Sequence, residues 1–414
     1  MRCFQAKYIF PIHTPPIKEG FLLTEDDGTV LETGIMLSPD ASMLNLKVEV
    51  LDGILVPGFV NTHCHLELSV MKGQLKRNTG MTGFISEFVS SRQDFSEADR
   101  MMAIEEGEKE MIREGIVAVG DISNGNNTFL QKSQKNLYYH TFLEVFDLHP
   151  SKTDQVFEHA QALQNELRTH CSGMDSGVSI VAHAPYTVTP RLHKRITENA
   201  QSKGSLLSIH SQESMEEEIF FRTGEGKLYE MYSRMGLDYS WFKPSGQNSL
   251  RSFMPYYEEI SKLLLVHNTY TTPEDYSYLA SLRRPALWIA TCPNANLFIE
   301  GKLPDYTAIL NSGLQVTIGT DSLASNNRLS VLEELKTISG AFPDIPLQTL
   351  FTWATLNGAW FLGIDSRYGS FEKGKRPGVL LVKGAGENRI SEQAFVQRLV
   401  RVTWPKSFPC QTGV

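Results

Sequence analysis

The sequence of 414 residues predicts an α/β fold, a (β/α)₈ barrel joined to a small β-sandwich domain. Eight apolar runs end abruptly in polar residues, and longer amphipathic segments with helical spacing lie between most of them. Strands that are buried on both faces read as near-continuous apolar runs, and a repeated strand–helix alternation is typical of the barrel. An open doubly wound sheet fits the same alternation. The polar residues at the strand ends favour the barrel, because barrel active sites collect side chains there.

The expected elements follow in order along the chain. The apolar runs, each an expected strand, are residues 57–65, 116–123, 138–146, 178–188, 206–214, 263–270, 286–294 and 314–322. The amphipathic segments, each an expected helix, include residues 97–114, 153–169, 190–202 and 273–282. These elements assign residues 57–364 to the barrel.

Both ends of the chain differ from the barrel in character. Residues 1–56 plus 365–414 carry short strand-like stretches and turns such as Asp26-Asp27-Gly28, and we expect them to form one β-sandwich domain together. Residues 223–259 are the longest insertion between barrel strands and are rich in Tyr, Phe, Gly and Ser. This insertion is expected to be a loop that covers the substrate.

Composition and charge exclude several classes of protein. With 41% hydrophobic and 21% charged residues, the chain has enough apolar material for a large core and does not resemble a disordered protein. The formal net charge of −8 gives no electrostatic reason to expect a nucleic acid or an anionic membrane as partner, so we expect a small-molecule substrate. The five cysteines form no CxxC pair, and no apolar stretch reaches the ~20 residues of a membrane span. We expect a cytoplasmic protein, with a homodimer as one possible assembly.

Histidines and one aspartate close several of the expected strands. His63 and His65 follow an apolar run, and the period of two along a strand sends both imidazoles to the same side. A single such pair fits a chance occurrence or a hydrogen-bonded surface pair as well as a metal site. His210, His267 and Asp321 close three further runs, however, at the strand ends where a barrel would bring them together. The pattern therefore favours a metal site.

These motifs resemble the metal-dependent amidohydrolase superfamily, and in particular its aminohydrolase branch. The resemblance rests on residues 57–65 (PGFVNTHCH), 210–213 (HSQE), His267 and residues 320–327 (TDSLASNN). The pattern is closest to aminodeoxyfutalosine deaminases and methylthioadenosine/S-adenosylhomocysteine deaminases. The resemblance implies that one divalent metal ion is bound by four side chains, His63, His65, His210 and Asp321. Zn²⁺ is the first choice, and Fe²⁺ or Mn²⁺ fits the same ligands.

The resemblance also bears on the number of metal ions and on proton transfer. Dinuclear members use a carboxylated lysine from the fourth barrel strand, but residues 178–189 contain no lysine, which favours a single ion. Glu213 is expected to carry a proton to the substrate ring, although a glutamate at a helix start is the plainer interpretation. Asp321 is expected to accept the proton of the attacking water, while His267 orients that water or stabilises the new oxygen.

Several further residues are assigned to the substrate side. Glu67 is expected to bind sugar hydroxyls, with a structural salt bridge as the alternative. His183 resembles the fourth-strand histidine that contacts substrate in this branch. Ser322 is assigned to the same side and, with Asn326, to orienting Asp321. Three aromatic residues of the insertion, Tyr229, Trp241 and Phe242, are candidates for stacking on a base, although packing within the loop is the more common fate of such residues. Cys292 is interpreted as a structural residue.

The predicted function is hydrolytic deamination of a purine-nucleoside-like substrate such as aminodeoxyfutalosine, adenosine or S-adenosylhomocysteine, with release of ammonia. A second interpretation keeps the same metal site but changes the leaving group, as in a chlorohydrolase or a cyclic amide hydrolase. A third is a catalytically silent binding protein on the same fold. The joint presence of Glu213 and Asp321 argues against the third interpretation, because a binding protein would need neither of them.

Overall fold

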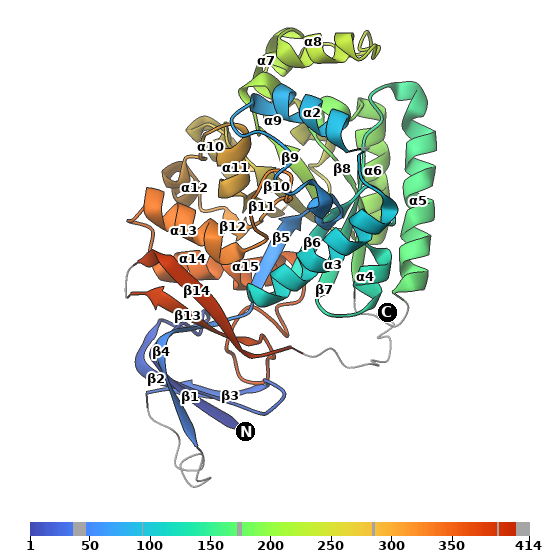
Figure 1. The fold of residues 1–414 in the computed structure, drawn as a ribbon. Helices are drawn as coiled ribbons and strands as arrows, with labels where there is room; N and C mark the ends of the chain where they lie inside the picture. The colour runs from blue at the N-terminus through green and yellow to red at the C-terminus, as the bar shows by residue number, and fades with distance from the viewer. Residues whose placement is uncertain (36–46, 93, 172–175, 284–285, 387–388, 403–414) are drawn as a thin grey trace.

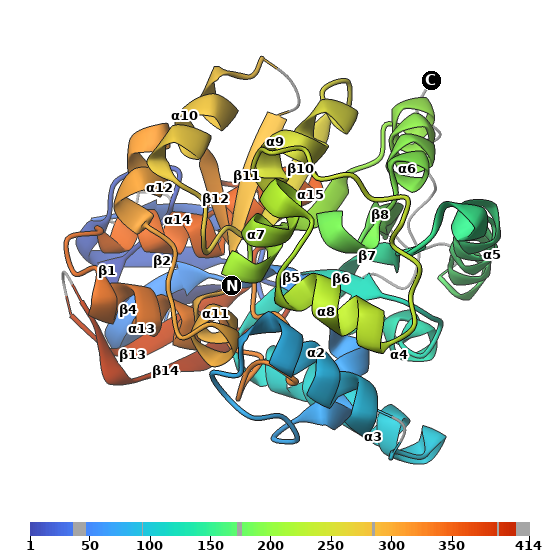
Figure 2. The same cartoon turned by 90° about the horizontal axis from the view of Figure 1, so that it is seen from above.

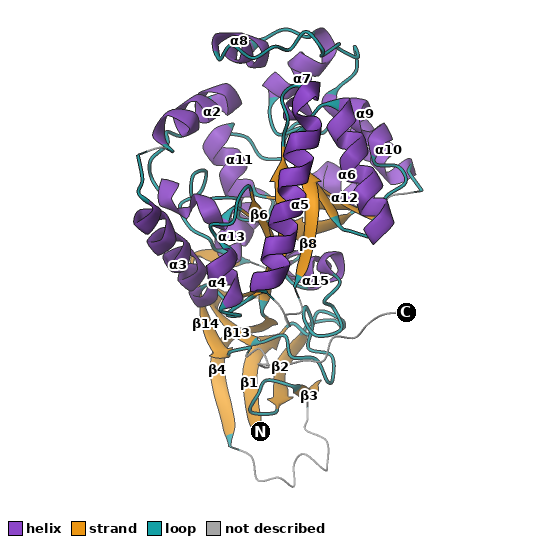
Figure 3. Cartoon of the chain, turned by 90° about the vertical axis from the view of Figure 1, so that its right-hand side faces the viewer, coloured by secondary structure: helices purple, strands orange, loops and turns teal. Residues whose placement is uncertain are grey.

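The computed structural model describes residues 1–35, 47–92, 94–171, 176–283, 286–386 and 389–402. Figure 1 shows a ring of parallel strands surrounded by helices, with a separate sheet below it that contains strands from both ends of the chain. Figure 3, coloured by secondary structure, shows the helices enclosing the strands of the ring.

Each of the eight apolar runs contains a strand. The strands form two four-stranded parallel sheets. The first sheet consists of β5 (Phe59–Cys64), β6 (Ile116–Ser123), β7 (Tyr138–Val145) and β8 (Gly177–Ala182). The second consists of β9 (Leu207–Ser211), β10 (Lys262–His267), β11 (Ala286–Thr291) and β12 (Gln315–Ile318). Several runs extend past their strand, because the residues behind the strand ends are buried as well.

Backbone hydrogen bonds connect the two sheets at both edges. Between β8 and β9, the amide of His210 donates to the carbonyl of His183 at 3.0 Å. Between the end of β12 and β5, the amides of Thr320 and Asp321 both donate to the carbonyl of His63 at 3.0 Å. The strands therefore follow one another around a ring, which is the arrangement of a barrel and not that of an open doubly wound sheet.

The four expected helices lie within one residue of their predicted bounds. They are α3 (Glu97–Arg113), α5 (Thr153–His170), α6 (Pro190–Lys203) and α10 (Pro273–Ser281). Further helices are α2 (Gly80–Ser91), α4 (Phe129–Ser133), α7 (Met215–Thr223), α8 (Lys227–Arg234), α9 (Ser249–Phe253), α11 (Pro293–Ile299), α12 (Tyr306–Ser312), α13 (Val331–Ala341), α14 (Leu347–Ala354) and α15 (Leu356–Leu362). Short 3₁₀ helices are η1 (Leu66–Met71), η2 (Pro150–Lys152), η3 (Pro185–Thr187) and η4 (Met254–Tyr256). Within the described residues, no helix is long and apolar enough to cross a membrane.

Local sequence signals explain where these helices begin and end. Ser96 accepts a hydrogen bond from the amide of Asp99, whose side chain accepts one from the amide of Ser96, so a capping box starts α3. Thr189 caps α6 ahead of Pro190, and Gly204 ends the helix in the left-handed conformation that glycine adopts without strain.

Strands from both termini form one six-stranded sheet. Its order is β14 (Ile390–Val400), β13 (Val379–Ala385), β4 (Val48–Pro57), β1 (Arg2–Ile9), β2 (Ile17–Thr24) and β3 (Val30–Gly34). The two termini share a sheet as predicted, but the described strands make a single hydrogen-bonded sheet where two packed sheets of a β-sandwich were expected. The sheet curls over its own core, so that Val400 of β14 lies against Gly28 beside β3.

Alternation along the strands divides this sheet between two cores. Phe4, Leu55 and Leu381 belong to the small core inside the curl. Their neighbours Ile54 and Leu380 point the other way, into the main core of the molecule. Because the two faces of this sheet contribute to different cores, the terminal strands pack directly on the barrel through the main core.

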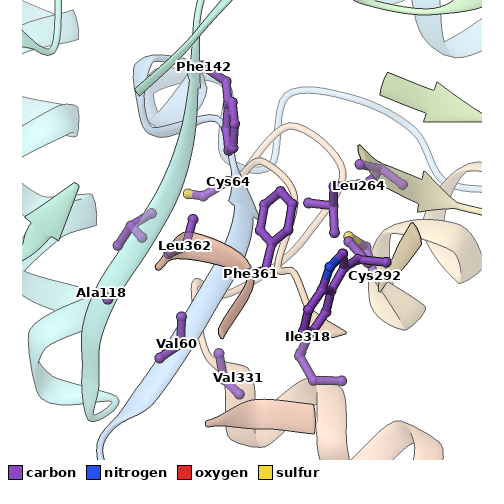
Figure 4. Close-up of a cluster of buried hydrophobic side chains, with 14 of the residues drawn as sticks. Val60, Cys64, Ala118, Phe142, Leu264, Cys292, Ile318, Val331, Phe361 and Leu362 are labelled. Atoms are coloured by element: carbon purple, nitrogen blue, oxygen red, sulfur yellow. The ribbon is translucent and has the colours of Figure 1, made fainter. Parts of the chain in front are cut away.

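A cluster of buried apolar side chains, the apolar plug, packs between the strands of the ring and α15. Figure 4 shows Val60, Phe142, Leu264, Ile318 and Phe361 converging from different elements, and each of them is fully buried. The described cysteines Cys3, Cys64, Cys171 and Cys292 are buried and unpaired, while Cys410 lies outside the described residues. Burial raises the pKa of the Cys292 thiol well above its usual range, in keeping with a packing role.

Gly120 of β6 is a position where only a hydrogen fits. A Cβ atom there would lie 2.5 Å from the backbone oxygen of Thr62 and 3.0 Å from the ring of Phe142. We expect Gly120→Ala to lower the free energy of unfolding by about 1–3 kcal/mol, the usual cost of overpacking. Urea unfolding followed by circular dichroism measures it. Gly125→Ala is the control, because a Cβ at Gly125 meets nothing within 4 Å. Equal stability of the two variants would show that β5 and β6 can move apart.

Candidate metal centre

The four predicted metal ligands lie together at the carboxyl ends of the barrel strands. His63 lies in β5, and His65 is the first residue after that strand. His210 lies in β9, and Asp321 follows β12. Figure 2 looks down on this end of the ring, where α2, α7 and α8 lie around the mouth. His267, the last residue of β10, joins the same cluster.

The ligand atoms lie within a few ångströms of one another. The Nε2 atoms of His63 and His65 are 3.2 Å apart. The Asp321 Oδ1 atom lies 3.7 Å from His63 Nε2 and 3.4 Å from His65 Nε2. One ring nitrogen each of His63, His210 and His267 lies within 4.8 Å of the other two. The chain therefore brings together side chains that are up to 258 residues apart, from His63 to Asp321.

Hydrogen bonds on the far side of two rings fix their tautomers. His210 Nδ1 lies 2.6 Å from the carbonyl oxygen of His183, and His267 Nδ1 lies 2.8 Å from Asn296 Oδ1. Because both partners are acceptors, Nδ1 carries the hydrogen and Nε2 is left with a lone pair. Burial lowers the pKa of His65 and His267 to about 4 and that of His210 well below its usual value. The imidazoles are therefore neutral, which is the form that binds a metal.

Asp321 is held as a carboxylate among these rings. Burial alone would raise its pKa, but the neighbouring imidazoles of His63, His65 and His267 lower it below its usual range. The Ser325 hydroxyl donates to its second oxygen, Oδ2. Asp321 and His267 both have a positive φ, 55° and 71°, a conformation that costs free energy in residues other than glycine. Such strain is common where a structure holds functional groups in place.

This donor set fits a single divalent cation. Three neutral imidazole nitrogens and one carboxylate oxygen are a common catalytic ligand set for zinc and related ions. Their buried lone pairs face one another, an arrangement that a shared cation stabilises. At the end of the fourth barrel strand, β8, the chain has His183 and not a lysine, as the sequence indicates. The Nδ1 atom of His183 forms a hydrogen bond with Thr187 Oγ1 at 2.9 Å.

Glu213 lies between the end of β9 and the start of α7. Its Oε1 atom is 3.4 Å from His267 Nε2, and its side chain is buried. Burial, with Asp321 and Glu217 nearby, raises the pKa of the Glu213 carboxyl group well above its usual value. Ser214 caps α7, so Glu213 precedes the helix and is not part of its first turn. This placement favours proton transfer over the helix-start interpretation.

The residues predicted on the substrate side have different positions. Glu67 and His183 lie beside the cluster, and the ring of His183 is 4.9 Å from that of His210. Ser322 is 2% exposed, and its hydroxyl lies 3.2 Å from that of Ser325, which donates to Asp321 Oδ2. Asn326 donates to the Thr320 carbonyl and to Glu334. Thus Ser325 holds Asp321 directly, where Ser322 and Asn326 were expected to do so.

The insertion at 223–259 is not the simple loop that was expected. It contains α8 and α9, and its aromatic residues pack mainly on one another and on α7. Phe242 stacks on Phe220 with ring centroids 4.2 Å apart, and Trp241 Nε1 donates to the Leu148 carbonyl. Tyr229 is exposed on α8. Packing within the insertion therefore accounts for Trp241 and Phe242.

Two residues at the end of β7 were not predicted. Glu144 is buried beside His65 and His210, and Phe146, two residues further on, is 41% exposed with its ring 6.0 Å from that of His183. A glutamate inside the apolar run 138–146 is the signal that could have identified this strand end.

Removal of ligands tests the metal centre. We expect protein purified without chelator to carry about one divalent ion per chain, and His63→Ala or His210→Ala to lose it. Elemental analysis measures the ion, and a chelator should lower the melting temperature of the unmodified protein, since the ion stabilises only the folded state. His159→Ala, an exposed position on α5, is the control. An unchanged metal content in both ligand variants would place the ion elsewhere.

Comparisons with known proteins identify the family of the chain. The sequence matches the Amidohydrolase family over residues 54–403. An adenosine deaminase of Helicobacter pylori is 28% identical over 387 residues, covering 91% of each chain. An aminodeoxyfutalosine deaminase of Deinococcus radiodurans is 28% identical over 318 residues, covering 75% of this chain and 73% of that protein.

A solved structure has the same fold. The Helicobacter pylori aminofutalosine deaminase, crystallised with methylthio-coformycin, superposes with a TM-score of 0.79 at 22% sequence identity and covers 92% of each chain. At this identity the likeness concerns the fold alone. The family match covers most of the chain, however, and the protein belongs to the amidohydrolase family.

Proposed function

We propose that the protein is a metal-dependent deaminase that replaces an exocyclic amine of a purine-nucleoside-like substrate by oxygen. The observation that carries this proposal is the buried Glu213 carboxyl group, whose Oε1 atom lies 3.4 Å from His267 Nε2 beside the histidine–aspartate cluster. The names of the two relatives support the reaction class. Aminodeoxyfutalosine, adenosine and S-adenosylhomocysteine are the candidate substrates.

Zn²⁺ is the metal that we propose for the site. Imidazole nitrogen and carboxylate oxygen are common zinc ligands, and Fe²⁺ or Mn²⁺ would fit the same set. When bound, such an ion acts as a Lewis acid that lowers the pKa of water. His63, His65, His210 and Asp321 would hold it.

The side chains of the site then divide the proton transfers of the reaction. Asp321 accepts a proton from the attacking water, and Glu213 donates its proton to the ring nitrogen next to the reacting carbon. Without that proton, negative charge would build up on the ring. The water oxygen bonds to the ring carbon, the proton held by Asp321 passes to the exocyclic nitrogen, and the bond from the carbon to that nitrogen breaks. The hydroxyl proton of the new carbon–oxygen group returns to Glu213, so that one water is consumed for each ammonia released. His267, whose ring is fixed through Asn296, stabilises the developing charge on oxygen.

His183 and Phe146 are the proposed contacts for the body of the substrate. The exposed ring of Phe146 stands edge-on to His183 beside the cluster. An aromatic side chain that is exposed at the mouth of a barrel can stack on a planar base.

An ammonia-release assay with Glu213→Gln tests the function. We expect the metal-loaded protein to release ammonia from at least one of adenosine, 5′-methylthioadenosine, S-adenosylhomocysteine and aminodeoxyfutalosine. Glu213→Gln should keep its metal but lose turnover by about 10²–10⁴-fold, because a glutamine cannot donate a carboxyl proton. Glu225→Gln, an exposed glutamate just after α7, should be unchanged.

Three results would contradict the proposal. Activity in Glu213→Gln equal to that of the unmodified protein would remove the assigned proton donor. A metal-loaded protein that is inactive on all aminated heterocycles, yet hydrolyses a chlorinated triazine or a cyclic amide, would show that the leaving group is different. Inactivity on every one of these compounds would favour a binding protein on the same fold.

A further inference from the structure

A buried glutamate of α7 holds the turn that carries Glu213. Glu217 is fully buried, and its Oε2 atom accepts the backbone amide of Glu213 at 3.2 Å. Its Oε1 atom accepts the backbone amide of Gln212, also at 3.2 Å. In an ordinary capping box, a glutamate at this position would accept the amide of the cap residue, here Ser214. Glu217 reaches past the cap instead and binds the two residues before it.

The turn needs a support because its backbone is strained. Gln212 has a φ of 46°, in the left-handed region that is costly for residues other than glycine. Directly after it, the Glu213 side chain extends to His267, whose Nε2 atom lies 3.4 Å from Glu213 Oε1. The two hydrogen bonds to Glu217 act on this same turn, so they bear on where the Glu213 carboxyl group lies.

The insertion at 223–259 in turn holds Glu217. Ser249, the first residue of α9, is fully buried, and its hydroxyl donates to Glu217 Oε1. Figure 2 shows α9 beside α7. Asn248, which caps α9, donates its side-chain amide to both oxygens of Asp275 on α10, at 2.8 and 2.9 Å. The insertion is thus anchored to the barrel next to Glu217 by bonds between buried residues.

We propose that Glu217 is a positioning residue that aims the Glu213 carboxyl group at the substrate, and that the insertion keeps Glu217 in place through Ser249. This inference rests on the proposed function and deepens it, because it gives the assigned proton donor its support. It also gives the insertion a role that its aromatic packing does not explain. Glu217 acts through the backbone amide of Glu213 and takes no part in the proton transfer.

Glutamine cannot replace Glu217 in this role. A carboxyl group offers one oxygen to each of the two amides, whereas glutamine has a single oxygen and turns its NH₂ group, a donor, toward the other amide. Two donors that face each other in a buried place are costly, so the turn should relax. Proton transfer depends steeply on geometry, and a shift of about 1 Å can lower turnover by about 10²-fold.

A double-mutant cycle tests the assignment. We expect Glu217→Gln to lower kcat for the best of the candidate substrates by about tenfold to hundredfold, with KM and metal content nearly unchanged. In a protein that already carries Glu213→Gln, the same change should alter kcat by less than about twofold, because no proton donor is left to misplace. Equal losses in the two backgrounds would show that Glu217 has a general structural role, and the inference would be wrong.

A buried glutamate at the opposite end of the strands supplies the matched control. Glu108 on α3 accepts hydrogen bonds from Asn136 at 2.9 Å and from Tyr139, near the amino end of β7, at 2.8 Å. Glu108→Gln should lower the melting temperature but leave kcat unchanged.

A milder variant covers the case in which Glu217→Gln does not fold. Ser249→Ala removes only the hydroxyl that anchors Glu217, and we expect it to lower kcat by about threefold to tenfold in the same cycle. The loss should again disappear in the Glu213→Gln background. A loss of the same size in both backgrounds, or no loss in either, would overturn the inference.

Crystal structures separate this inference from the proposed function. In metal-loaded Glu217→Gln, the distance from Glu213 Oε1 to His267 Nε2 should grow by about 1 Å or more, while His210 keeps its hydrogen bond to the His183 carbonyl. That shift supports the positioning role even if the protein releases no ammonia. A Glu213 carboxyl group in its original position overturns the inference, whatever the reaction proves to be.

Discussion

The structure depends on holding the four predicted ligand groups His63, His65, His210 and Asp321, whose lone pairs repel one another, close together in a buried place. The connection between β12 and β5 shows how this is done. Both Thr320 and Asp321 donate their backbone amides to the carbonyl of His63, and Asn61 exchanges side-chain bonds with Thr320. The first and last strands of the ring are thereby locked at the residues that carry two of the ligands. The left-handed backbone of Asp321 is held in place by these bonds.

A buried ion pair positions the segment behind His65. The Asp121 carboxylate in β6 accepts the amide of Leu66 at 2.9 Å and lies 2.6 Å from Lys132 Nζ, and both charged side chains are almost fully buried. Leu66 begins η1, so Asp121 determines where the chain turns directly after the ligand. A buried pair of this kind adds little net stability, but breaking it is costly. Together with the apolar plug below, it gives the ligands a rigid floor.

Much of the fold and the core of the site could be predicted from the sequence. The eight strands, and His63, His65, His210 and Asp321 at their ends, follow from apolar runs that stop at polar residues. The single curled sheet could not be predicted, because strand pairing depends on contacts between the two termini. Ser325 was missed in favour of Ser322 because the path of a turn decides which hydroxyl faces a carboxylate. The cytoplasmic location, the homodimer and the domain boundaries stay predictions.

Burial and neighbouring carboxylates together raise the pKa of Glu213, and burial is the larger cause. After burial, the negative charges of Asp321, Glu217, Glu300 and Glu144 raise its pKa further. Glu217 is itself buried, with a pKa raised to about 8 mainly by burial and by Glu218, and it accepts the amides of Gln212 and Glu213. Groups coupled in this way titrate together, so a change of charge at one carboxylate shifts the others.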